Sequence, residues 1–324
     1  MKFQPDYQFE VIPEDAFNEK LSQILAQLET CRTEGTFAGK DGNQMYYEYY
    51  LAQESKGTVV IVHGLSEFIP KYHEFAWYLL NQGYNVFIYD QRGHGKSCRL
   101  TDRIDLIHVG KFGDYVKDLH RFVCDVVKPV GELPLFLYGH SMGGAVAALY
   151  LAYHPDVFSK AVLSAPMIEP LTGDVHPVVA RVGLTLMTPF VNGKKKFWGS
   201  DEFNPEYKFE RAADKSYARF KRNMQLRIAN PCYQTTPMSM RWVQQSVILR
   251  PRLTRRSFLR RIQTPVLMLC AQEDGAVSTG AQAVFAAKCD ACRRVVVPDS
   301  THSMLNGTEE TIATHVRYVL DHFV

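Results

Sequence analysis

Short apolar runs rich in β-branched residues alternate along most of this chain with longer segments of helical period. This alternation is typical of a parallel sheet whose strands are covered by helices on both faces. The runs predicted as strands are TVVIVHG (58–64), YNVFIYD (84–90), LPLFLYGHS (133–141), KAVLSAP (160–166), TPVLMLC (264–270) and RRVVVPD (293–299). The segments predicted as helices are 71–83, 112–127, 142–154, 280–289 and 308–323. We therefore predict a doubly wound, mostly parallel α/β sheet, with MYYEYYLA (45–52) as an antiparallel edge strand.

The alternation fails once, between Pro166 and Gln263. This stretch contains short helical patterns such as SYARFKRNMQLRI (216–228) and no convincing buried strand. A structureless loop of that length is uncommon in a compact domain. We predict an α/β core made of residues 1–165 and 264–324, interrupted by an inserted helical cap domain, residues 166–263.

The pentapeptide GHSMG, residues 139–143, lies where a predicted strand turns into a predicted helix. It fits Gly-x-Ser-x-Gly, in which the serine projects from a sharp turn at the carboxyl end of the sheet and the glycines avoid collisions with the strand and helix. The pattern favours Ser141 as a catalytic nucleophile. The alternative is a tight turn whose serine only caps the following helix.

A nucleophilic serine needs a base to take its proton and a third group to orient that base. The chain offers His302 after the last predicted strand, and Glu273 and Asp274 after the strand before it. We predict His302 as the base and Asp274 as the acid, with Glu273 as the lesser alternative. We expect His315 and His322, seven residues apart on the last helix, to lie on its surface.

The tetrahedral intermediate of such a reaction also needs donors for its oxyanion. These donors are normally the backbone amide of the residue after the nucleophile and an amide from the loop after an earlier strand. In this chain the first is the amide of Met142, and the second is the amide of Leu65 in VIVHGLSEF. We predict both amides as the oxyanion hole. His63 and Glu67 are expected to support the loop rather than to accept the proton.

Two other motifs are interpreted as incidental. DQRGHGKS (90–97) ends like a nucleotide-binding P-loop, but the first glycine of that motif would fall at Asp90. Cys289 and Cys292 have the spacing of half a zinc site, without a second pair to complete it. We therefore expect neither a metal nor another cofactor, and we interpret the seven cysteines as reduced thiols.

Five motifs of this chain resemble those of a known family. HGLSE, YDQRGHGKS, GHSMGG, the acid loop and THSM together resemble the α/β-hydrolase branch that contains monoacylglycerol lipases and bacterial lysophospholipases, also called the serine aminopeptidase-like group. The segments RFKRNMQL and RWVQQSVI are most similar to the lysophospholipase members. The resemblance spans about residues 40–324. It implies the α/β-hydrolase fold, Ser141, His302 and Asp274 as the triad, and the Leu65 and Met142 amides as the oxyanion hole. One departure is CAQED, which lacks the glycine that often opens the acid loop.

Charge gives a clue to the substrate, which the fold alone does not determine. Residues 193–262 contain 17 basic and 5 acidic residues, whereas the whole chain has a net charge of +3. A basic cap that also carries aromatic side chains suits an anionic bilayer and an acyl chain; the alternative is that much of this charge forms a solvated helix face. An aminopeptidase would instead need carboxylates for its substrate's ammonium group. We predict an enzyme that hydrolyses carboxylic esters of single-chain lipids, either lysophospholipids or monoacylglycerols. The alternatives are an aminopeptidase or small-ester esterase of the same fold, or a non-catalytic binding protein.

The first residues carry charges and prolines where a signal peptide needs an apolar core, and no window reaches the about 18 apolar residues of a membrane span. We expect a cytoplasmic protein that contacts membrane surfaces peripherally through the basic cap. Its expected partner is a lipid or ester substrate, and we expect no nucleic acid.

Overall fold

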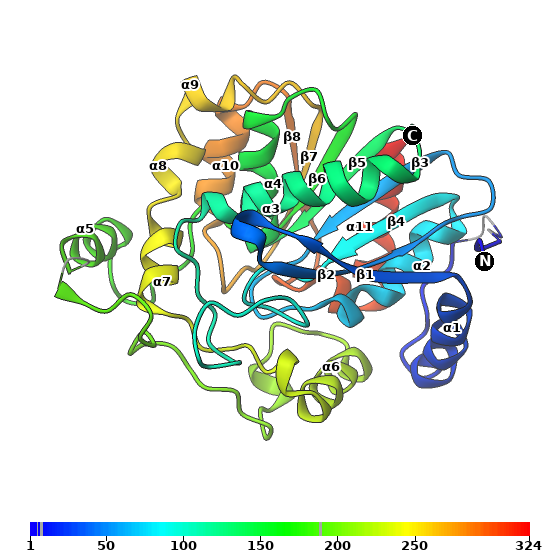
Figure 1. The fold of residues 1–324 in the computed structure, drawn as a ribbon, viewed down its shortest axis with the longest axis horizontal. Coiled ribbons are helices and arrows are strands. Elements are labelled where there is room, and N and C mark those ends of the chain that lie inside the picture. The colour runs from blue at the N-terminus through cyan, green and yellow to red at the C-terminus, as the bar shows by residue number, and fades with distance from the viewer. Residues whose placement is uncertain (5, 7–8, 188–189) are drawn as a thin grey trace.

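A sheet of eight strands forms the centre of the computed structural model, which describes residues 1–4, 6, 9–187 and 190–324 (Figure 1). The strand order is β1-β2-β4-β3-β5-β6-β7-β8, and only the pairs β1/β2 and β2/β4 are antiparallel. The strands are β1 (Arg32–Ala38), β2 (Gln44–Tyr50), β3 (Gly57–Val62), β4 (Tyr84–Tyr89), β5 (Leu135–His140), β6 (Lys160–Ser164), β7 (Val266–Ala271) and β8 (Cys292–Val297). The predicted doubly wound, mostly parallel sheet is confirmed.

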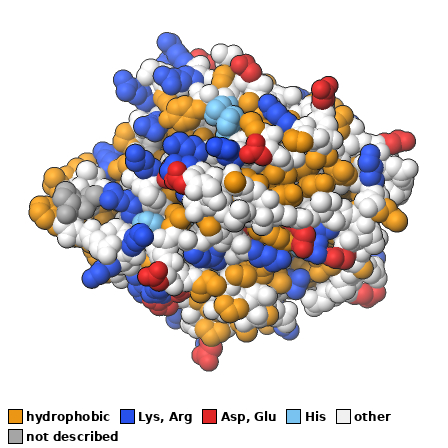
Figure 2. Space-filling model, viewed as in Figure 1, with side chains coloured by type: hydrophobic (Ala, Val, Ile, Leu, Met, Phe, Trp, Pro, Cys, Tyr) orange, Lys and Arg blue, Asp and Glu red, His pale blue; other side chains and the backbone are white. Residues whose placement is uncertain are grey.

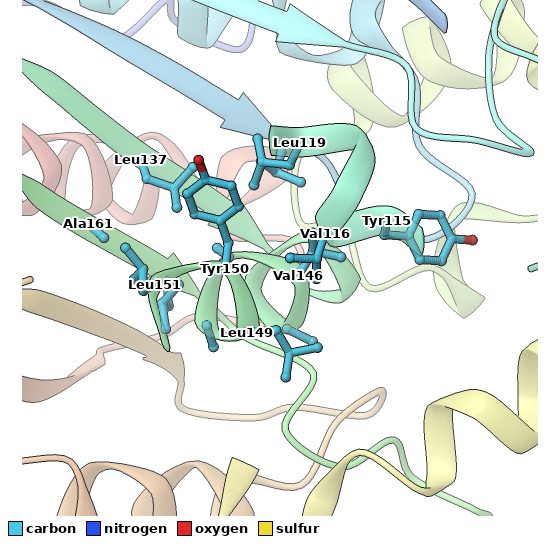
Figure 3. Packing of buried hydrophobic residues seen from close by; sticks show 14 of the residues in the cluster. Tyr115, Val116, Leu119, Leu137, Val146, Leu149, Tyr150, Leu151 and Ala161 are labelled. Carbon is cyan, nitrogen blue, oxygen red and sulfur yellow. The ribbon is translucent and has the colours of Figure 1, made fainter. Parts of the chain in front are cut away.

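Helices cover both faces of this sheet, because its inner strands are apolar on both sides. One apolar cluster joins the sheet to α3, α4 and α10, and Figure 3 shows part of it around Tyr150 and Leu119. A second cluster joins the opposite face to α1, α2 and α11. The helices of the two layers are α1 (Phe17–Cys31), α2 (His73–Asn81), α3 (Gly113–Phe122), α4 (Met142–Tyr153), α10 (Thr279–Lys288) and α11 (Glu309–Phe323).

The segment predicted as an antiparallel edge strand forms β2, which is antiparallel to both of its neighbours. The predicted edge position of this strand is wrong. β1 pairs with β2 in an antiparallel register from Arg32 opposite Tyr50 to Ala38 opposite Gln44, so β1 forms the edge. Only Phe37 of β1 is buried, and such a strand gives no alternating apolar pattern.

Between β6 and β7 the chain leaves the sheet, in the region predicted as the cap. We call residues 165–265 the β6–β7 insertion. Thr188 and Pro189, within it, lie outside the described residues. Figure 1 shows its helices along the left and lower sides of the molecule. They are α5 (Pro177–Met187), α6 (Tyr217–Ala229), α7 (Met240–Val247), α8 (Arg250–Leu253) and α9 (Arg256–Leu259). The division into core and cap domains stays a prediction.

The surface position expected for His315 is wrong. Its side chain is fully buried, and its Nε2 lies 3.0 Å from the hydroxyl of Tyr138 on β5. His315 belongs to the stripe of α11 that faces the sheet, since Ile312 and Val319, three and four residues away, are buried as well. His322, by contrast, is partly exposed.

No helix in the described part of the chain is both long and apolar enough to cross a bilayer.

Candidate active site

Ser141 lies in the turn that joins β5 to α4, with φ 51° and ψ −116°. This left-handed conformation is strained for a residue with a side chain, and it persists because neighbouring strands hold it. The Ser141 amide donates to the Ser164 carbonyl (2.9 Å), and the Ser141 carbonyl accepts from the Met167 amide (2.9 Å). A Cβ atom on Gly143 would lie 2.0 Å from the Val62 carbonyl oxygen, so only glycine fits there. The turn has the form of a nucleophile elbow.

His302 follows β8 and contacts both other residues predicted for the site. The Ser141 hydroxyl lies 2.9 Å from its Nε2, and Asp274 Oδ2 lies 2.9 Å from its Nδ1. With the proton on Nδ1, the ring donates to Asp274 and accepts from the serine hydroxyl. The structure therefore brings Ser141, His302 and Asp274 into one hydrogen-bonded row.

Asp274 is held by its own loop as well as by His302. Its Oδ1 accepts hydrogen bonds from the amides of Ala276 (2.9 Å) and Val277 (3.0 Å), and its side chain is fully shielded from solvent. Burial would raise the pKa of this carboxyl, but the hydrogen bonds from His302 and the two amides outweigh burial and hold the pKa below its ordinary value. Asp274 is therefore ionised at neutral pH.

Glu273, the alternative acid, has a different environment. It is exposed, and its backbone amide donates to the Ser300 carbonyl (3.0 Å). Its carboxylate makes no hydrogen bond to His302 within the described part of the chain. The geometry thus favours Asp274 as the partner of the histidine.

The loop after β3 carries Leu65, and a buried carboxylate braces it. Glu67 accepts from the Gly64 amide (2.6 Å), the Tyr72 hydroxyl (2.5 Å) and the Lys71 ammonium group (2.5 Å). Burial would raise the pKa of Glu67, but the charge of Lys71 and these hydrogen bonds outweigh it and hold the pKa well below its usual range. Glu67 therefore acts as a fixed anion that shapes the loop.

His63 holds the other side of this loop. Its Nδ1 lies 2.8 Å from the Gly64 carbonyl, and its Nε2 accepts from the Gln91 amide (2.9 Å). Neither the Leu65 amide nor the Met142 amide donates to another described residue, so both are available to an oxyanion. Glu67 and His63 support the loop, as the sequence suggested, while the catalytic use of the amides stays a prediction.

His140 is a site residue that the sequence reasoning missed. Its ring is buried, lies 5.2 Å from the ring of His302, and has Nε2 3.7 Å from a Glu67 oxygen. Burial lowers the pKa of His140 to about 4, so the ring is neutral and places no second cation beside His302. The available signal was its position inside GHSMG, directly before Ser141.

A serine, a carboxylate and a histidine in this chain order, at the carboxyl ends of β5, β7 and β8, are typical of a serine hydrolase of the α/β-hydrolase fold. A family model described as serine aminopeptidase, S33 matches residues 53–309. The chain therefore belongs to this family of hydrolases.

Curated relatives extend the match to nearly the whole chain. Lysophospholipase L2 of Escherichia coli (strain K12) is 29% identical over 279 residues, which cover 82% of this chain and 77% of the relative. The probable lysophospholipase L2 of Haemophilus influenzae is 25% identical over 306 residues, covering 94% and 95%. Monoglyceride lipase of Rattus norvegicus is 32% identical over 155 residues, covering 47% and 50%.

Solved structures support the same fold. A thermostable carboxyl esterase from Bacillus coagulans superposes with a TM-score of 0.70 at 18% identity, over 91% of this chain and 99% of the esterase. A monoglyceride lipase from Saccharomyces cerevisiae superposes with a TM-score of 0.67 at 20% identity, over 89% and 92%.

Proposed function

We propose that this protein hydrolyses the carboxylic ester bond of single-chain lipids through an acyl-enzyme formed on Ser141. The observation that carries the chemistry is the hydrogen-bonded row from Asp274 through His302 to the Ser141 hydroxyl. A serine hydroxyl becomes a competent nucleophile at neutral pH when an oriented imidazole takes its proton.

In the proposed acylation step, the Ser141 Oγ attacks the ester carbonyl carbon while its proton moves to His302 Nε2. Asp274 stabilises the imidazolium that forms, because its carboxylate remains ionised and bonded to Nδ1. The negative charge on the former carbonyl oxygen is received by the amides of Leu65 and Met142. When the intermediate collapses, His302 returns the proton to the departing alcohol.

The deacylation step repeats this chemistry with water. His302 takes a proton from the water molecule, whose oxygen attacks the acyl carbon, and the Ser141 Oγ leaves with that proton. The neutral state of His140 favours both steps, because a charged neighbour at this distance would oppose formation of the His302 imidazolium. The products are a fatty acid and the alcohol of the substrate.

Two kinds of observation support a lipid substrate. The relatives that cover most of this chain carry the name lysophospholipase L2, and a shorter match is to a monoglyceride lipase. The β6–β7 insertion also carries α5, in which no residue is buried and Val179 and Leu186 are 62% and 68% exposed. An exposed apolar helix of this kind suits an enzyme that meets its substrate at a lipid surface.

A hydrolysis panel tests the substrate class. We expect kcat/KM to be higher for lysophosphatidylcholine or a long-chain monoacylglycerol than for p-nitrophenyl acetate, because only the lipids bring an acyl chain that binds apolar surface. An aminoacyl amide should be the poorest substrate. If kcat/KM were highest for the aminoacyl amide, the protein would be a peptidase rather than a lipid hydrolase. If kcat/KM were highest for short esters, it would be an esterase of soluble substrates.

We further propose that the insertion contacts anionic membranes through α5 and the lysines that follow it. Figure 2 shows hydrophobic side chains gathered at the left-hand tip of the molecule, where α5 lies in Figure 1. Lys194 and Lys195 are exposed nearby in the sequence, whereas Lys196 is bound to Glu202 (2.8 Å). Lys194 and Lys195 are therefore the lysines of this run that are free to meet lipid phosphates.

Replacing Lys194 and Lys195 with glutamine should weaken co-sedimentation with anionic vesicles. Each basic residue near an anionic bilayer contributes about 1 kcal/mol, so the double variant should lose roughly tenfold or more in affinity at low salt and less at high salt. Lys20→Gln/Lys128→Gln, which removes the same charge from exposed positions outside the insertion, is the control. Equal losses in the two variants would show that net charge, rather than this surface, drives the binding.

A further inference from the structure

A cleft of about 820 Å³ lies between the core and the β6–β7 insertion, away from the residues of the candidate active site. One wall is the start of α3 with Leu149 of α4, and the other wall is formed by α7, α8 and α9. Leu149 is eight residues beyond Ser141, or about 12 Å along the helix axis, and Figure 3 shows it pointing from α4 away from Tyr150. None of Ser141, Asp274 and His302 lines the cleft.

Four exposed cations line this cleft from both walls: Lys111 before α3, and Arg252, Arg255 and Arg261 in and around α8 and α9. None of them forms an ion pair with a carboxylate of the described residues, and no acidic side chain lines the cleft. Figure 2 shows basic side chains gathered in the upper left, where α8 and α9 lie in Figure 1.

Neighbouring arginines show that carboxylates are within reach of these helices. Arg250 pairs with Glu169 (3.2 Å), and Arg256 pairs with Asp290 (3.6 Å). These two do not line the cleft. The four cations that line the cleft make no such pair with a described carboxylate, although like charges gathered without a counterion repel one another.

The floor of the cleft is apolar. Phe112, Leu149, Leu249 and Phe258 contribute buried side chains to it, and all four belong to the apolar cluster on this face of the sheet. The Arg261 guanidinium lies over the Phe258 ring, 5.9 Å from its centroid. A polar cationic rim above an apolar floor is complementary to a molecule that has a negative group at one end and a hydrocarbon chain at the other.

We infer that this cleft is a second ligand site, which binds an anionic single-chain amphiphile. The phosphate or carboxylate head group lies among Lys111, Arg252 and Arg255, and the chain lies against the apolar floor. The volume suits one such molecule, since small-ligand sites span about 300–1,000 Å³. The inference is independent of the proposed hydrolysis, because binding here uses no residue of the triad.

Calorimetric titration with dodecyl phosphate, below its critical micelle concentration, tests this site. Dodecyl phosphate contains no carboxylic ester, so the measurement does not depend on the proposed reaction. Inorganic phosphate lacks the chain and dodecanol lacks the charge, and each should bind at least about tenfold more weakly. Dodecanoate shows whether a carboxylate head group serves as well as a phosphate.

A matched pair of variants locates the binding. Arg252→Gln/Arg255→Gln should weaken dodecyl phosphate binding about tenfold or more, because it removes charge-assisted hydrogen bonds from the cleft. Arg256→Gln/Arg260→Gln removes the same charge from positions outside the cleft and should leave the affinity unchanged. Lys111→Gln, on the opposite wall, should weaken binding too. Thermal unfolding of each variant shows that it is folded.

Several results would overturn the inference. Equal losses in the two double variants would indicate non-specific attraction, and tight binding of dodecanol would show that the cations are not used. Slower hydrolysis of p-nitrophenyl acetate by Arg252→Gln/Arg255→Gln would make the cleft part of the catalytic site. A duplex oligonucleotide that binds where dodecyl phosphate does not would assign the cations to nucleic acid instead.

Discussion

Ser141→Ala is expected to lower kcat for ester hydrolysis by about 10³-fold or more while leaving the fold intact. The serine Oγ is the only non-hydrogen atom removed, and among the described residues no other hydroxyl contacts His302 Nε2 to take its place. Alanine has no larger a side chain than serine, so the strained turn with φ 51° accepts it at little further cost. Steady-state kinetics on p-nitrophenyl acetate measures the loss, and circular dichroism reports the fold.

Covalent labelling distinguishes two causes of lost activity, the loss of the nucleophile and weaker binding of the substrate. A fluorophosphonate should phosphonylate the wild type at Ser141 and leave Ser141→Ala unlabelled. Ser164→Ala is a suitable control, since Ser164 is also a buried strand-end serine, and it should be labelled like the wild type. A Ser141→Ala variant that retained most of its esterase activity would remove Ser141 from the mechanism, and an unlabelled wild type would support a non-catalytic binding protein.

The inner strands could be predicted because each is buried on both faces and therefore appears as a continuous apolar run. The same reasoning does not reach β1, which buries only Phe37. The helix α1 is also absent from the predicted elements, although its sequence does carry a signal. Apolar residues repeat there at helical spacing, at Phe17, Leu21, Ile24 and Leu28. The spacing between His315 and His322 alone does not predict the burial of His315, which follows from the apolar stripe of α11 that contains it.

The three residues of the candidate site could be predicted from the sequence for a related reason. Each follows a predicted parallel strand, and the carboxyl ends of such strands meet at one edge of the sheet. The surroundings of these residues depend instead on how loops from separate strands meet, which one sequence does not reveal. The contact between His140 and His302 is of this kind, as is the bracing of Gly64 by Glu67 and Lys71. The cationic cleft likewise becomes visible only when α8 and α9 pack beside α3.

Asp274→Asn is expected to reduce kcat by about 10³- to 10⁴-fold. An asparagine amide fits the same volume, but it cannot accept from His302 Nδ1 with the charge of a carboxylate, and its NH₂ group favours the wrong tautomer of the ring. The Oδ1 hydrogen bonds to the Ala276 and Val277 amides can survive the change, so the loop should stay in place. The measurement is kcat on a soluble ester, beside thermal unfolding of both proteins.

Glu273→Gln is the matched control, because it makes the same chemical change at the neighbouring residue. We expect it to have little effect, since Glu273 is exposed and its carboxylate does not contact His302 in the described structure. The two variants together decide which acid orients the base. A large loss in Glu273→Gln with a mild one in Asp274→Asn would move the acid to Glu273, and the hydrogen bond of 2.9 Å between Asp274 and His302 would then be structural rather than catalytic.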